Sequence, residues 1–280
     1  MKNIRSLILS LTLLLMTSNL SEAQTMGKYA NVNGIKMYYE VHGTGSPLVL
    51  IHGGGSTIKT NFSRIMPEFA KTHQVIAVEL QAHGHSGDRD APESFTQDAD
   101  DVAELLNQLN IPKADFLGFS NGGQTCLELG LRHADKVRKL VIASAFYSRD
   151  AVPETFWNGF ETPDFTHMPQ IYKDEYLKIG TREGLMNMFN KDAQRMYTFK
   201  GWTDEQIRSI QAPALVVIGD QDLATPEHAA KMARLFPHGR LAILPGTHGS
   251  YIGEAYNPKP ESKIPDLFVA MVNEFLAGEL

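Results

Sequence analysis

The stretch "LGFSNGGQTC", residues 117–126, places a single serine, Ser120, among three glycines. It overlaps the end of the apolar run "ADFLGF" (114–119), which is typical of a buried strand, and a helical pattern follows over 123–133. A serine on a sharp turn from strand to helix has a strained backbone, and only small residues fit two positions before it and two after it. The pattern therefore predicts that Ser120 is an exposed nucleophile beside the free N–H groups of a helix N-terminus.

Apolar runs of strand length recur along the chain and alternate with helical patterns. Strands are expected at 34–43, 47–55, 74–80, 139–144, 214–219 and 240–245, and helices at 98–110, 227–235 and 264–276. Such alternation gives right-handed crossovers and a mostly parallel sheet with helices on both faces. The fold class is therefore α/β, and we expect one domain over residues 24–280.

The interval between Ser144 and Ala212 contains no pattern of a buried strand. Residues 146–202 nevertheless hold 12 of the chain's 25 aromatic residues. We interpret about 146–210 as an inserted helical cap, because the segment is too aromatic for a linker and too long for a simple crossover. Open α/β sheets bind ligands at the carboxyl ends of their strands, so we expect some of these aromatic side chains to line a pocket there.

The first 23 residues differ from the rest of the chain. They have a basic start, an apolar run over 7–16 and a small-x-small sequence that ends at Ala23, which together are typical of a secretory signal peptide. The apolar run is about half of the roughly 20 residues that a membrane-spanning helix needs. We expect cleavage rather than a membrane anchor, and a mature protein that begins at Gln24 and is periplasmic or secreted.

Composition excludes several classes of partner and site. The formal net charge is −6 and no block of lysine or arginine occurs, so we expect neither nucleic acid nor an anionic membrane as a partner. The single cysteine, Cys126, excludes an intrachain disulfide and a metal site built from cysteines.

A nucleophilic serine requires a base and a group that orients the base. After a strand-to-helix nucleophile turn, the acid follows the serine in the chain and the histidine comes last. His248 in "LPGTHGSYIG" directly follows the last expected strand, and Asp220 and Asp222 in "VVIGDQDLATP" follow the strand before it. The amide of Asn121, the residue after the nucleophile, is expected to donate to the oxyanion of a tetrahedral intermediate.

The segments "HGGGS", "ELQAHGHSGD", "GFSNGG", "GDQD" and "GTHG" occur in the order seen in the α/β-hydrolase superfamily, which the chain resembles over its whole length after the leader. The resemblance implies an α/β-hydrolase fold. Members often carry G-x-x-D after the strand that precedes the acid, which selects Asp222 and makes Asp220 a turn residue. The resemblance also implies that Gly54 supplies the second oxyanion donor, with Gly55 as the second choice.

Three histidines that precede Ser120 need a separate interpretation. His52 precedes the serine and ends a strand, so we expect it to hold its loop rather than to act as a base. His83, His85, Asp88 and Asp90 in "AHGHSGDRD" suggest metal ligands at first sight. The superfamily has a similar loop here without a metal, so we expect neither a metal nor a cofactor.

Fold alone does not determine the reaction. Dehalogenase and epoxide-hydrolase relatives have an aspartate in place of Ser120, and proline iminopeptidase relatives have proline and tryptophan in place of Gly55 and Asn121. The sequence predicts a serine hydrolase that cleaves a carboxylic ester of a small hydrophobic substrate through a Ser-His-Asp triad and an acyl-enzyme. Alternatives on the same triad are a C–C bond hydrolase, a lactonase and a cofactor-free haloperoxidase or perhydrolase. A non-catalytic binding protein on this scaffold is the alternative from a different class.

Overall fold

The structure is a computed structural model that describes residues 27–256 and 258–278. The expected leader, residues 1–23, lies outside the described residues. Within these residues the chain forms one eight-stranded sheet. Its strands are β1 (Lys28–Val32), β2 (Ile35–His42), β3 (Ser46–Ile51), β4 (His73–Glu79), β5 (Ala114–Phe119), β6 (Val137–Ala143), β7 (Ala214–Gln221) and β8 (Gly239–Thr247).

Helices connect most of the strands. The α-helices are α1 (Ile58–Phe62), α2 (Met66–Phe69), α3 (Phe95–Gln108), α4 (Asn121–Arg132), α5 (Glu154–Asn158), α6 (Gln170–Leu177), α7 (Arg182–Tyr197), α8 (Asp204–Ser209), α9 (Pro226–Leu235) and α10 (Ile264–Ala277). Short 3₁₀ turns are η1 (Arg149–Ala151), η2 (Phe165–His167) and η3 (Ser250–Ile252). In this part of the chain, no helix combines the length and the apolar character needed to cross a bilayer.

The strands lie in the order β1-β2-β4-β3-β5-β6-β7-β8. The pairs β1–β2 and β2–β4 are antiparallel, and every later pair in the sheet is parallel. The predicted α/β class with a mostly parallel sheet is confirmed. Because β3, β5, β6, β7 and β8 run the same way, the loops after them meet at one edge of the sheet.

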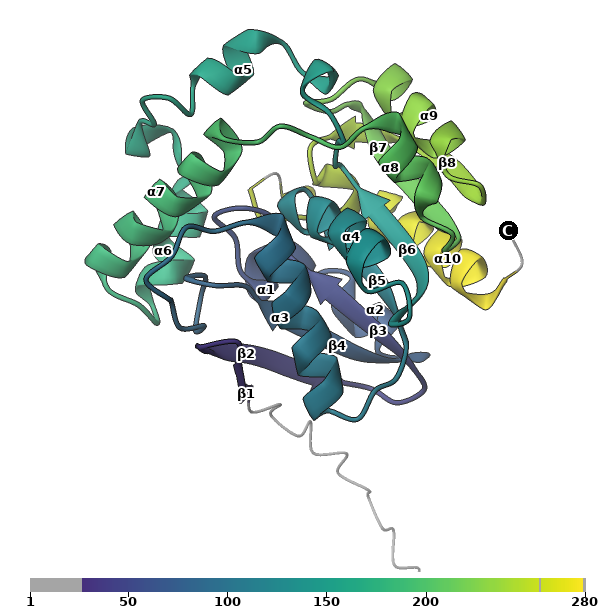
Figure 1. Cartoon of the computed structure of the whole chain (residues 1–280), viewed down its shortest axis with the longest axis horizontal. Coiled ribbons are helices and arrows are strands. Elements are labelled where there is room, and N and C mark those ends of the chain that lie inside the picture. Colours follow the sequence, from purple (N-terminus) through teal and green to yellow (C-terminus); the bar gives the residue numbers. More distant parts are fainter. Residues whose placement is uncertain (1–26, 257, 279–280) are drawn as a thin grey trace, which may run out of the picture.

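Both faces of the sheet are covered, as the continuous apolar runs of its strands require. On β3, Val49 and Ile51 pack into a core shared with α3, α4 and α9, whereas Leu48 and Leu50 pack into a second core shared with α1, α2 and α10. Figure 1 shows the sheet between these two groups of helices. Because successive side chains of a strand point to opposite faces of the sheet, each such strand contributes side chains to both cores.

Three short elements were not expected from the sequence. The strand β1 has five residues, α1 has five and α2 has four. Segments of this length complete at most slightly more than one helical turn or two strand repeats, so hydrophobic periodicity gives no signal for them. Tertiary contacts stabilise them instead: Phe62 of α1 and Phe69 of α2 are fully buried.

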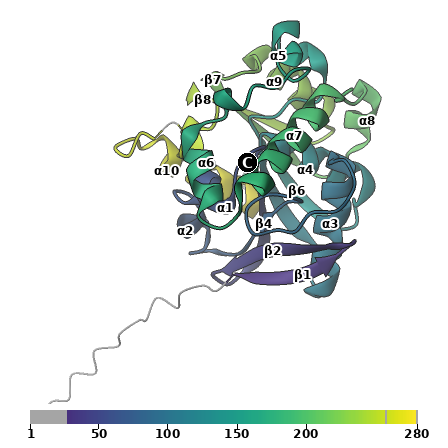
Figure 2. The ribbon, with the colours of Figure 1, turned by 90° about the vertical axis from the view of Figure 1, so that its left-hand side faces the viewer.

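The segment between β6 and β7 contains helices and no strand. Figure 1 shows α5, α6 and α7 together on one side of the molecule, and Figure 2 shows α6 close to α1. The helices α6 and α7 contact each other, and α6 also contacts α1. Trp157 stacks on Phe199 with 5.5 Å between ring centroids, and both belong to the same core as α3 and α4. The last helix of the interval, α8, packs against α4 and α9 of the body.

Candidate active site

Ser120 stands at the junction of β5 and α4 with φ +52° and ψ −122°, a backbone conformation that residues other than glycine seldom adopt. The neighbouring glycines make this turn possible. A Cβ at Gly118 would lie 2.0 Å from the carbonyl oxygen of Gly122, and one at Gly122 would lie 2.1 Å from the carbonyl oxygen of Ile51. Any side chain at either position would collide with backbone, which explains the sequence pattern.

The structure brings Ser120, Asp222 and His248 together from the loops after β5, β7 and β8. The Nε2 atom of His248 lies 3.2 Å from Oγ of Ser120, and its Nδ1 lies 2.7 Å from Oδ1 of Asp222. Asp220 instead accepts a hydrogen bond from the amide of Gly246 at 2.8 Å and is exposed. This hydrogen bond stabilises the end of β8, and Asp220 contacts neither Ser120 nor His248.

The carboxylate of Asp222 is enclosed by donors. Besides His248 it accepts hydrogen bonds from the hydroxyl of Ser144 at 2.5 Å and from the amide of Leu223 at 2.7 Å. The hydroxyl of Tyr251 lies 2.7 Å from that of Ser144. Burial favours a raised pKa for Asp222, but the hydrogen bonds from His248 and Ser144 outweigh it and hold the pKa below its usual value. The group is therefore an anion that orients His248.

The two expected oxyanion donors lie beside the serine. Gly54 and Asn121 line the same cavity as Ser120 and His248. Within the described residues, neither the amide of Gly54 nor that of Asn121 has a protein acceptor. The amide of Gly55, the second choice, donates to Oδ2 of Asp192 at 2.5 Å. Gly54 and Asn121 are therefore the amides with capacity for an oxyanion.

A cavity of about 460 Å³ opens onto Ser120 and His248. Its apolar lining comes mainly from the inserted segment and includes Phe146, Phe156, Phe160, Met168, Tyr172, Phe189, Met196 and Leu223. The size is within the range of small-molecule sites, and such a lining favours a hydrophobic group.

His52 holds its loop through both ring nitrogens. Its Nε2 accepts from the amide of Leu80 at 3.0 Å, and its Nδ1 lies 2.7 Å from the carbonyl oxygen of Gly53. Burial, reinforced by the nearby charge of His83, lowers the pKa of His52 to about 3. The ring is thus neutral, and it contacts neither Ser120 nor Asp222.

The two histidines of "AHGHSGDRD", which suggest metal ligands in the sequence, pair with different acidic side chains. His83 pairs with Asp192 at 3.0 Å and His85 with Glu79 at 2.9 Å. Across residues 27–256 and 258–278, no three His, Cys, Asp or Glu side chains gather in a way that could hold a metal ion.

Residues 46–200, more than half of the chain, match the sequence model of the family described as alpha/beta hydrolase fold. The chain belongs to the α/β-hydrolase family. It is 29% identical over 226 residues to the 2-hydroxymuconate semialdehyde hydrolase of Pseudomonas sp. (strain CF600). The match covers 72% of this chain and 79% of that protein. It is 26% identical over 257 residues to a pimeloyl-[acyl-carrier protein] methyl ester esterase of Neisseria meningitidis serogroup A, covering 82% and 77%.

The fold also matches solved α/β hydrolases. The enol-lactonase from Burkholderia xenovorans LB400 superposes with a TM-score of 0.71 at 23% identity, over 89% of this chain and 99% of that one. The two relatives are a hydrolase and an esterase that carry different substrate names, so the chain is an α/β-hydrolase enzyme.

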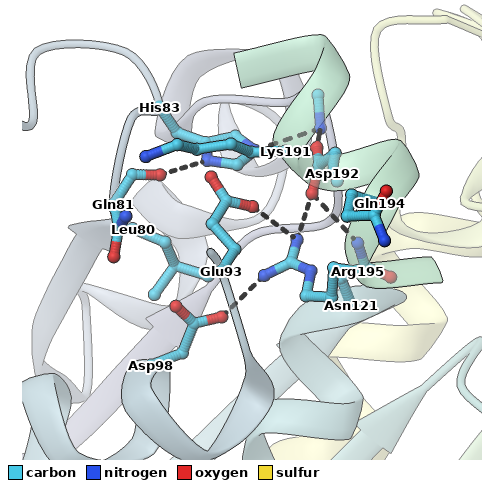
Figure 3. A network of polar contacts seen from close by, with 12 residues as sticks. Leu80, Gln81, His83, Glu93, Asp98, Asn121, Lys191, Asp192, Gln194 and Arg195 are labelled. Carbon is cyan, nitrogen blue, oxygen red and sulfur yellow. Dashed lines mark hydrogen bonds and ion pairs between the residues drawn. The ribbon is translucent and has the colours of Figure 1, made fainter. Parts of the chain in front are cut away.

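The hydrolase also holds a buried polar cluster that was not predicted from the sequence (Figure 3). Its centre is Asp192 on α7, the helix whose buried side also carries Leu185, Met188 and Met196. These four positions follow helical spacing, so an apolar residue is expected at 192. An acidic residue within an otherwise apolar stripe was the one available signal.

Proposed function

We propose that the hydrolase cleaves a carboxylic ester of a small hydrophobic substrate through an acyl-enzyme on Ser120. The observation that carries this proposal is the chain of contacts from Asp222 through His248 to Ser120, at 2.7 and 3.2 Å, beside an apolar cavity of about 460 Å³. The same contacts define the serine-histidine-aspartate arrangement used for acyl transfer on several unrelated folds.

In the first half of the reaction, Oγ of Ser120 attacks the ester carbonyl while Nε2 of His248 takes the hydroxyl proton. The carbonyl oxygen becomes an oxyanion, which the amides of Gly54 and Asn121 stabilise by roughly 3 kcal/mol each. The tetrahedral intermediate collapses when His248 returns its proton to the leaving alcohol. The acyl group is then left on Ser120.

In the second half, water takes the place of the alcohol. His248 removes a proton from the water as it attacks the acyl-enzyme, and the same two amides stabilise the second oxyanion. His248 then protonates Oγ of Ser120, which releases the carboxylic acid and restores the enzyme. The anionic Asp222 stabilises the imidazolium in both halves.

The proposal is tested with nitrophenyl esters from acetyl to hexanoyl, assayed beside a lactone, a peptide amide and a vinylogous diketone. Each methylene that the cavity accepts is expected to raise kcat/KM about fourfold, or about 0.8 kcal/mol, until the cavity is full. A flat or falling profile contradicts an acyl-binding pocket. Ser120-dependent cleavage of the diketone without ester turnover would identify a C–C bond hydrolase instead.

We further propose that the leader over 1–23 is removed and that the enzyme is exported to the periplasm or the medium. The support is the three-part pattern of basic start, short apolar run and small-x-small sequence before Gln24. Intact-mass measurement of the exported protein is expected to give a terminus at Gln24. A terminus at Met1 would contradict removal of the leader.

A further inference from the structure

The buried cluster joins the inserted segment to the body of the enzyme. We define it as His83, Glu93, Asp98, Asp192 and Arg195, of which the last two project from α7 toward the first three (Figure 3). Arg195 contacts Asp98 at 2.8 Å and Glu93 at 3.6 Å, and it donates a hydrogen bond to Asp192. All five residues are buried.

Asp192 also reaches the two loops that flank Ser120. Its Oδ2 accepts from the amide of Gly55 at 2.5 Å and lies 3.0 Å from Nε2 of His83. Its Oδ1 accepts from the side-chain amide of Asn121 at 3.4 Å. One carboxylate from α7 therefore contacts both the loop after β3 and the first residue of α4.

These loops carry the two proposed oxyanion donors, and the contacts around them are close. A Cβ at Gly54 would lie 2.5 Å from Nδ2 of Asn121 and 3.2 Å from Oδ2 of Asp192. The backbone of Gly54 is thus packed directly against both side chains. The position of Asp192 therefore constrains the backbone of Gly54 and the side chain of Asn121.

A carboxylate this close to a developing oxyanion disfavours it unless its charge is balanced. Burial by itself would lower the pKa of His83, but the charge and hydrogen bond of Asp192 outweigh burial and raise it to about 9. Burial raises the pKa of Glu93 to about 8 and that of Asp98 to about 6. Arg195 and the protonated His83 therefore place two cations beside Asp192, and the raised pKa values of Glu93 and Asp98 limit the negative charge around them.

We propose that Asp192 is a positioning residue that assembles the oxyanion hole. It holds Gly55 and Asn121 in place when α7 is docked, so that the amides of Gly54 and Asn121 converge on one point. The inserted segment then contributes to the chemical step as well as to substrate choice. This inference rests on the proposed acyl-transfer function of the site.

The first test compares Asp192→Asn with Lys191→Met, the neighbouring position on α7. Lys191 pairs with Asp88 across the same interface at 2.6 Å and contacts neither Gly54 nor Ser120. We expect kcat to fall about 10²-fold in Asp192→Asn, as when an oxyanion donor is lost, with KM changed less than about threefold. Lys191→Met is expected to keep both values near those of the wild type.

The second test measures the dissociation constant of an alkyl boronic acid, which forms a tetrahedral adduct with the serine and places a negative oxygen in the oxyanion hole. Asp192→Asn is expected to weaken this binding by about the same factor as it lowers kcat. Binding of the product carboxylic acid is expected to stay unchanged. A role limited to stability would change thermal unfolding and leave the boronate affinity of the folded protein intact.

Asn121→Ala provides a variant that keeps the backbone amide of residue 121 and removes the side-chain hydrogen bond to Asp192, together with the packing of that side chain against Gly54. We expect a smaller loss of kcat in the same direction, and a double variant with Asp192→Asn that loses less than the two single losses combined, since both act through one contact. This variant tests the inference even if Asp192→Asn does not fold.

An unchanged boronate affinity in folded Asp192→Asn, or a raised KM with kcat intact, would overturn the positioning role. The boronate measurement needs no ester turnover. A wild-type enzyme that binds the boronic acid and cleaves no ester therefore contradicts the proposed reaction alone, and the comparison between variants still decides the inference.

Discussion

Two aspartate–histidine pairs of this enzyme reach the cavity beside Ser120, Asp222 with His248 and Asp192 with His83. Their ring nitrogen to carboxylate distances are similar, 2.7 and 3.0 Å. Their surroundings are not, because the side chain of His248 is 26% exposed and that of His83 is fully buried. The nitrogen of His248 that faces away from its aspartate meets Ser120 in the cavity, whereas the corresponding nitrogen of His83 meets the carbonyl oxygen of Gln81 at 2.8 Å.

The difference shows that burial and the second partner, not the pair itself, decide what an aspartate–histidine pair can do. His248 links an anion to a hydroxyl that faces substrate, so it can carry a proton between them. His83 links an anion to a backbone carbonyl, which accepts a hydrogen bond but releases no proton. The first pair is suited to proton transfer, and the second to holding charge and position.

The largest expected effect separates the two histidines. His248→Ala, like Ser120→Ala, is expected to lower kcat by on the order of 10⁶ without loss of the fold, because the triad acts as a unit. His83→Gln is expected to lower kcat by about 10² or less, since its role passes through Asp192. Steady-state ester hydrolysis and circular dichroism of the three variants check this. Equal losses of kcat in His248→Ala and His83→Gln would contradict the different roles of the two pairs.

The next effect separates two aspartates at the carboxyl end of β7. Asp222→Asn is expected to lower kcat by about 10⁴, because an amide favours the wrong tautomer of His248. Asp220→Asn, which alters only the contact with Gly246, is expected to stay within about twofold of the wild type. The reverse order of the two losses would show that the acid has been assigned to the wrong residue.

The charged state of His83 gives a prediction about stability. Its pKa is raised from the usual 6.5 to about 9, so its protonation contributes up to about 3 kcal/mol that is complete below pH 6.5 and lost as pH rises to about 9. Urea unfolding of the wild type is expected to show this loss, and Asp192→Asn is expected to lack most of it. Parallel pH profiles for the two proteins would contradict a charged Asp192–His83 pair.

The smallest effect concerns the support of Asp222. Ser144→Ala removes a hydrogen bond to the carboxylate, so the pKa of Asp222 is expected to rise and kcat to fall about tenfold, consistent with the loss of one hydrogen bond to a charged group. Ser209→Ala, whose hydroxyl contacts only the carbonyl oxygen of Gln206, serves as the matched control. Equal kcat values for the two variants would show that Ser144 does not support the acid.

The parts of the site set by local sterics could be predicted from the sequence. The turn at Ser120 requires glycine at 118, where a Cβ would meet the carbonyl oxygen of Gly122, and the close approach of β3 requires glycine at 122. His248 and Asp222 follow apolar strands whose parallel arrangement brings their ends together. The expected strand at 114–119 coincides with β5, and the other expected strands have boundaries within a few residues, apart from the loop residues 52–55 that follow β3.

The cluster around Asp192 could not be derived in the same way. Gly55 and Asp192 are 137 positions apart, and their contact depends on how α7 docks on the body. Nothing local distinguishes Asp192 from a surface acid except its place in the apolar stripe of α7. Ser144 likewise gave no signal, because its contact with Asp222 joins the ends of two neighbouring strands.

The proposed reaction requires that Ser120 accepts the acyl group and that His248, not His83, is its base. Rapid mixing with nitrophenyl hexanoate, acid quench and peptide mass mapping measures it directly. We expect one hexanoyl group on Ser120 within the first turnover of the wild type, slower acylation of the same residue in His83→Gln, and none on this time scale in His248→Ala. An acyl group on another residue, or acylation of Ser120 at the wild-type rate in His248→Ala, would contradict it.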